Sequence, residues 1–288
     1  MSVTTDRPVG SASRGRWLER RRWVPVAVGI GFTVSWVCGL ALPVPNLAVT
    51  ASAAEVLAKY GPHLGMVQAQ FALTEGLPAI GLAVISLALA LLARRSGPGA
   101  EAGAAAGAGR AGARRAGARR VGARRARVIA VAGTVAAVIS VTQYALGVML
   151  AGWALPDHAA GRSGGLWEAI NRLDGVKMFA LAVLASAAVA LTAPTGPLPR
   201  WLRYASLTLA ASITVSGVAY LFLIQDLSWA AYVAGAALLV WVTGMGVALG
   251  RIPGRDGQSP RAGGSLRATE SLGATRSPRA TGSPQAGR

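Results

Sequence analysis

The sequence has little of what soluble enzymes and metalloproteins use most. Cys38 is the only cysteine among 288 residues, so an intrachain disulfide is excluded, and its place in an apolar run predicts a buried structural thiol. His63 and His158 are the only histidines, and both lie outside the apolar runs, where they cannot hold a haem between membrane spans. The motifs of zinc proteases, P-loop proteins and α/β-hydrolases are also missing. We therefore predict no cofactor, no metal site and no catalytic residue.

Charge is scarce as well. Only 14% of the residues are charged, whereas soluble domains are usually about a quarter charged. The hydrophobic share is 53% and the mean hydropathy is +0.46. A helix needs about 20 apolar residues to cross a membrane, because lipid offers no hydrogen-bond partner to the backbone. Six segments come close to that length, at residues 23–42, 77–93, 128–155, 175–193, 204–224 and 228–249. The sequence thus predicts an all-α, polytopic transmembrane helix bundle with six spans.

The basic residues alternate from one connection to the next. Of the 29 Lys and Arg residues, six lie before the first predicted span, ten between the second and third, two between the fourth and fifth, and seven after the sixth. Membrane proteins keep Lys and Arg in cytoplasmic segments, so we expect both termini in the cytoplasm.

Composition divides the chain into five parts. These are a basic cytoplasmic segment (1–22), two spans with their outer connection (23–94), an Arg/Gly/Ala-rich cytoplasmic linker (95–127), four spans (128–250) and a basic cytoplasmic tail expected to be disordered (251–288).

The linker contains the repeat "GARRAGARRVGARRAR", which has two interpretations. It is a solvated orientation signal, or it contacts anionic lipid headgroups, at about 1 kcal/mol per basic residue. The candidate headgroup contacts are Arg114, Arg115, Arg119, Arg120, Arg124 and Arg125. Nucleic acid is a poor fit, because no aromatic residue between the arginines is available to stack on a base. The lipid bilayer is the predicted partner, and a membrane-protein partner is left open.

Polar residues in three spans fall at nearly one depth. At about 1.5 Å per residue from the cytoplasmic ends of their spans, Gln143 lies about 22 Å, Lys177 about 24 Å and Glu75 about 27 Å away. With Asn171 and Asp174 from "INRLDGVKM", these residues predict a small polar chamber in the outer leaflet that binds a polar ligand or a proton. The alternative is an anchoring or packing role, in which Lys177 snorkels outward and pairs with Asp174.

These features predict a non-enzymatic binding, sensor or accessory protein. One alternative is a small-solute or proton-coupled transporter, because three-plus-three spans form two halves of inverted topology. A second alternative is an intramembrane enzyme that uses Glu75 or Asp174 as its acid or base.

Several stretches resemble one group of proteins. An arginine-rich start is followed by "LWEAINRLDGVKMFALAVLA", "LPRWLR", "SGVAYL" and "AAYVAGAALLVWVTGMGVALGR". This order resembles the uncharacterised six-span integral membrane proteins common in high-GC Gram-positive bacteria, over residues 23–251. The resemblance implies a six-span topology and a location in the plasma membrane of a bacterium. It implies no activity.

Overall fold

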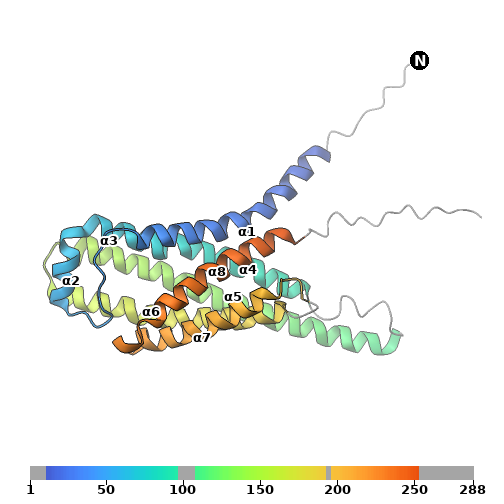
Figure 1. The fold of residues 1–288 in the computed structure, drawn as a ribbon. Coiled ribbons are helices and arrows are strands. Elements are labelled where there is room, and N and C mark those ends of the chain that lie inside the picture. Colours follow the sequence, from blue (N-terminus) through green and yellow to red (C-terminus); the bar gives the residue numbers. More distant parts are fainter. Residues whose placement is uncertain (1–10, 97–107, 193–195, 253–288) are drawn as a thin grey trace, which may run out of the picture. The chain divides into compact units, whose positions relative to one another are not determined.

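The computed structural model describes residues 11–96, 108–192 and 196–252, and the elements in these ranges are all helical (Figure 1). The α-helices are α1 (Ser11–Leu40), α2 (Ala53–Tyr60), α3 (Leu64–Phe71), α4 (Leu77–Arg95), α5 (Ala108–Met149), α6 (Ala160–Val189), α7 (Trp201–Leu221) and α8 (Ala230–Arg251). Two π-helical segments continue α3 and α5, η2 (Ala72–Gly76) and η3 (Leu150–Ala154). Short 3-10 turns are η1 (Gly61–His63), η4 (Ala190–Thr192) and η5 (Gln225–Leu227).

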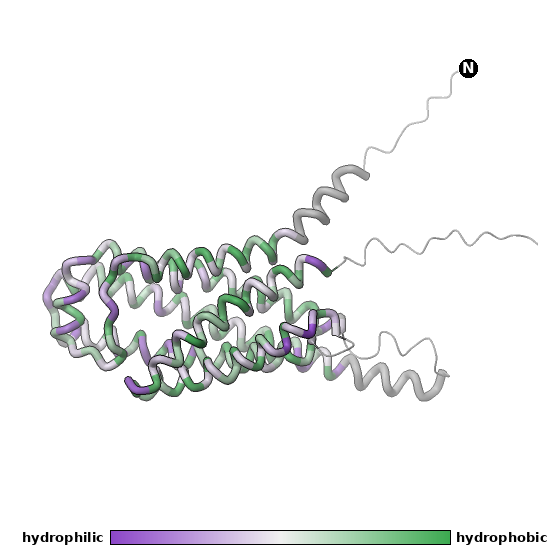
Figure 2. Tube along the Cα trace, in the orientation of Figure 1, coloured by the Kyte–Doolittle hydropathy of each residue, from purple (hydrophilic) through white to green (hydrophobic). Residues whose placement is uncertain are grey.

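Six helical stretches are long and apolar enough to cross a membrane, which confirms the predicted number for the described residues. They are Trp23–Leu40, Ala53–Arg94, Arg120–Ala154, Ala160–Thr192, Trp201–Leu221 and Gln225–Arg251. Hydrophobic residues follow the length of these helices, whereas hydrophilic residues gather near their ends (Figure 2). The described part of the chain is therefore all-helical, with six helices of the length and composition of membrane spans.

The spans form a ring in which each contacts the next along the chain. α1 packs on α4, α4 on α5, α5 on α6, α6 on α7 and α7 on α8, and α8 returns to α1. Short connections favour this order, because helices adjacent in sequence then become antiparallel neighbours. One end of the bundle carries Arg94, Arg127, Arg203 and Arg251, and we call it the arginine-rich end. The other carries α2 and α3, and we call it the cap end (Figure 1).

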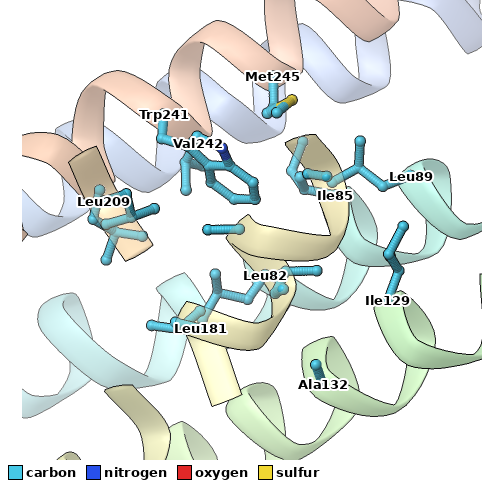
Figure 3. Packing of buried hydrophobic residues seen from close by; sticks show 14 of the residues in the cluster. Leu82, Ile85, Leu89, Ile129, Ala132, Leu181, Leu209, Trp241, Val242 and Met245 are labelled. Atoms are coloured by element: carbon cyan, nitrogen blue, oxygen red, sulfur yellow. The ribbon is translucent and has the colours of Figure 1, made fainter. Parts of the chain in front are cut away.

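A large apolar cluster fills the bundle toward the arginine-rich end (Figure 3). Trp241 of α8 is fully buried there, and its indole N–H donates a hydrogen bond of 2.8 Å to the Ser206 hydroxyl of α7. Its other labelled members in Figure 3 are Leu82, Ile85, Leu89, Ile129, Ala132, Leu181, Leu209, Val242 and Met245. We call it the arginine-end core.

A second apolar cluster lies under α2 and α3, and we call it the cap core. Its buried members are Val44, Val56, Tyr60, Val67, Phe71, Leu150, Ala151, Ala154, Leu155 and Ile170. Ser52 starts α2 with a capping box, in which its hydroxyl and the Glu55 carboxylate each accept a backbone N–H. Trp167 ties the cap to α6, because its ring meets the Tyr60 ring edge-on at 5.7 Å and its N–H donates to the Ala48 carbonyl at 3.1 Å.

The structure differs from the sequence-based expectations at two places. Residues 97–107 of the predicted linker lie outside the described residues, but α5 already begins at Ala108, so the arginine repeat continues the third span as helix. Alanine and arginine are among the strongest helix formers, which explains the extension.

Cys38 is exposed, because Phe32, Ser35 and Gly39 occupy the inward face of α1. The predicted tail beyond Ile252 lies outside the described residues.

Candidate functional site

Glu75, Asp174 and Lys177 form a three-charge cluster inside the bundle, and we call it the ionic cluster. The Lys177 ammonium lies 2.8 Å from each Glu75 carboxylate oxygen and 2.6 Å from Asp174 Oδ1. The side chains of Lys177, Glu75 and Asp174 are 10%, 13% and 17% exposed. Glu75 comes from η2, whereas Asp174 and Lys177 are one turn apart on α6. These are three of the five residues that the sequence predicted for one chamber, and a fourth, Gln143, contacts them.

Gln143 of α5 completes the contact between helices. Its side-chain amide donates to Asp174 Oδ1 at 3.2 Å and to the Ile170 carbonyl of α6 at 3.1 Å, and the residue is 1% exposed. Its carbonyl oxygen is buried and has no hydrogen-bond partner within the described part of the chain. The buried Ser140, one turn earlier on α5, lies close to the Glu75 carboxylate. The site therefore contains a buried free acceptor beside two carboxylates.

Asn171 stands apart from the ionic cluster. Its side-chain amide donates a 2.8 Å hydrogen bond to the Trp167 carbonyl one turn earlier on α6, and the residue is buried. It precedes Asp174 by about one turn of α6, but this bond is to its own helix. The hydrogen bond described for the Asn171 side chain therefore stays within α6.

The formal charges of the ionic cluster do not cancel, because two carboxylates face one ammonium. An unpaired charge in a water-poor interior is costly, and carboxylates that share a site avoid it by sharing a proton. The geometry of the cluster therefore suits the uptake of one proton.

A π-helical turn positions Glu75. In η2 the Leu77 N–H bonds to the Ala72 carbonyl, five residues back, where an α-helix would use the fourth. This register leaves backbone carbonyls to be satisfied from outside, and the Ser35 hydroxyl of α1 donates to the Leu73 carbonyl at 2.6 Å. Single π-turns inside helices are frequent at functional sites. Sequence reasoning missed η2 and the supporting contacts of Ser35 and Ser140.

The ionic cluster lies between the two apolar clusters. Along α6, the cap-core residue Ile170 precedes Asp174 and Lys177, and the arginine-end core begins at Leu181. Along the continuous α3–η2–α4 stretch, the cap-core residue Phe71 precedes Glu75, and Leu82 of the arginine-end core follows it. Apolar packing on both sides lowers the local dielectric constant, which strengthens the ion pairs and raises the cost of any unpaired charge.

The structure describes the side chains of only some of the arginines predicted to contact lipid headgroups. Arg120, Arg124 and Arg125 are exposed on α5 toward the arginine-rich end. The side chains of Arg114, Arg115 and Arg119 lie outside the described residues, although their backbone is helical. Lipid contact by these arginines stays a prediction.

Among the side chains that the structure describes, no group of three His, Cys, Asp or Glu residues is arranged to hold a metal ion. Comparison with known proteins finds no matching family model, no matching curated protein and no matching solved structure. The similarity to six-span proteins of high-GC Gram-positive bacteria therefore stays a prediction.

Proposed function

We propose that this protein is a non-enzymatic sensor or accessory protein of a bacterial plasma membrane, and that its ionic cluster binds one proton. The observation that carries the proposal is the juxtaposition of two carboxylates and one ammonium at 2.6–2.8 Å in a buried site. One proton cancels the excess charge. Protonation also removes an acceptor from the cluster, so it changes how η2, α5 and α6 are held together.

The apolar packing favours a role in sensing protons over a role in transporting a solute. A solute that crossed the bundle from the ionic cluster would have to separate the arginine-end core, which includes the fully buried Trp241, Ile85 and Leu184. A proton bound from the cap side needs only local opening of the cap core. An intramembrane enzyme would require substrate beside Glu75 or Asp174, where the contacts observed are with Lys177, Gln143 and Ser140.

The proposed orientation places the arginine-rich end in the cytoplasm. It rests on the rule that cytoplasmic segments retain Lys and Arg. With six spans, both termini lie on that side, and the cap end with the ionic cluster lies toward the outer face. The proton then comes from outside the cell.

Thiol labelling tests this orientation. In a Cys38→Ala background, we expect a membrane-impermeant maleimide on intact cells to label Gly161→Cys at the cap end. Arg203→Cys at the arginine-rich end should react only after the membrane is permeabilised. Both positions are exposed, and the opposite labelling pattern would reverse the orientation.

Infrared difference spectroscopy tests proton binding. We expect the protein in lipid nanodiscs, taken from mildly alkaline to mildly acidic pH, to gain the high-frequency carbonyl band of a carboxylic acid shielded from water. Glu75→Gln and Asp174→Asn should each abolish this band, because either change leaves a neutral pair of one carboxylate and Lys177.

Glu168→Gln is the matched control. Glu168 pairs with Arg172 at 2.8 Å on the same helix, but both side chains are about half exposed. Its variant should keep the band of the wild type. A wild type without the band, or a band that survives in both cluster variants, would refute proton binding at this site.

A further inference from the structure

An apolar groove runs along the outside of the bundle between α5 and α6, and we call it the α5–α6 groove. It encloses about 530 Å³. Its lining includes Arg127, Val131 and Val135 from α5 and Val176, Phe179 and Val183 from α6. α5 and α6 are antiparallel, so Arg127 and Val183 lie toward the arginine-rich end, whereas Val135 and Val176 lie toward the middle of the bundle. From Arg127 to Val135 the groove is about 12 Å long.

The α5 side of the groove continues into a basic stripe. Arg120, Arg124 and Arg127 are spaced by four and three residues, and Val131 and Val135 follow at intervals of four. This spacing places all five on one face of the helix, and all are exposed. One helix face thus changes from cationic to apolar at the level of Arg127.

We propose that the α5–α6 groove binds one anionic phospholipid. One acyl chain lies between Val131 and Phe179, and the phosphate contacts Arg127, with Arg124 one turn further out. The charge of the stripe selects the occupant: apolar helix surface alone accepts any lipid, but a guanidinium at the end of the groove favours an anionic headgroup over a zwitterionic one. This inference is independent of proton binding at the ionic cluster.

Native mass spectrometry of the delipidated, detergent-solubilised protein tests the site, with phosphatidylglycerol and phosphatidylcholine as probes. We expect one phosphatidylglycerol per chain to bind more tightly than phosphatidylcholine. Arg127→Gln should weaken phosphatidylglycerol binding about fivefold, the factor that corresponds to about 1 kcal/mol per basic residue, and should leave phosphatidylcholine binding unchanged. Ala180→Leu, which fills the groove, should weaken the binding of both lipids.

Two variants outside the groove serve as controls. Arg203→Gln removes an exposed arginine at the same end of the bundle, and Ala145→Leu enlarges an exposed alanine on α5. Both should bind phosphatidylglycerol as the wild type does. Equal losses in Arg127→Gln and Arg203→Gln, or equal affinity of the wild type for both lipids, would overturn the proposal. A lipid-free dimer that Ala180→Leu dissociates would also overturn it, because the groove would then be covered by a second copy of the chain.

Discussion

Lys177→Met should lower the free energy of unfolding by about 3–5 kcal/mol, the usual cost of removing one partner from a buried ion pair. The ammonium is the only cation within reach of Glu75 and Asp174 in the contacts described, and it touches three carboxylate oxygens at 2.6–2.8 Å. Methionine has a similar length, so packing is largely kept while two carboxylates lose their counter-ion. Chemical unfolding of the purified variant in detergent measures the loss.

The loss should depend on pH. Without Lys177, the two carboxylates can reach neutrality only by taking up protons, which are more available in acid. The difference in unfolding free energy between the wild type and Lys177→Met should therefore be larger at mildly alkaline pH and smaller at mildly acidic pH.

Arg172→Met separates the effect of burial from that of pairing. Arg172 lies 2.8 Å from Glu168 on the same helix, but the pair is about half exposed, and exposed pairs contribute about 0–1 kcal/mol. A comparable loss in both variants would mean that the ionic cluster gains nothing from its apolar surroundings.

Stability and proton binding distinguish two roles for the ionic cluster. If Lys177→Met is destabilising and the wild type shows no shielded carboxylic acid, the cluster only fastens η2, α5 and α6 together. If the acid band appears and is lost in Glu75→Gln, the same contacts respond to protons. The positions of the three charged groups do not separate these two roles, because both roles need an ammonium near carboxylates.

The spans were predictable because lipid imposes a simple rule. A membrane helix must be long and apolar, and both properties are read directly from composition. The same constraint fixes the rise per residue, so counting along each span puts Glu75, Gln143 and Lys177 at similar depths. Whether these side chains meet depends on the order of the helices around the ring. The depth of a residue in its span says nothing about that order.

The sequence also did not give the rotation of each helix about its own axis. Asn171 and Lys177 share a stripe on α6, yet Lys177 reaches Glu75 whereas Asn171 bonds to the Trp167 carbonyl. The π-turn in η2 shifts the register of Glu75 relative to α4, and no residue type in "ALTEG" marks such a turn. Its support by Ser35 depends on the packing of α1, and the Ser35–Leu73 contact joins residues 38 apart in sequence. Long-range contacts of this kind arise from the assembled bundle.

Gly175→Ala should lower the free energy of unfolding by about 1–3 kcal/mol, the usual cost of overpacking a well-packed interface. A Cβ at Gly175 would lie 2.6 Å from the Leu221 backbone nitrogen and 2.8 Å from the Gly217 carbonyl oxygen. Both are backbone atoms of α7, so no side chain can turn aside and the two helices must separate. Unfolding in detergent measures the effect.

Gly165→Ala on the same helix is the matched control, because a Cβ there meets no atom within 4 Å. An alanine in an open helical position should stabilise the protein by about 0.5–1 kcal/mol. Opposite signs for the two substitutions would assign the cost at Gly175 to helix contact. Equal effects would contradict the close approach of α6 and α7. Since Gly175 lies between Asp174 and Lys177, separating these helices should also move the ionic cluster. The shielded carboxylic acid band of Gly175→Ala should therefore shift in frequency, whereas that of Gly165→Ala should match the wild type.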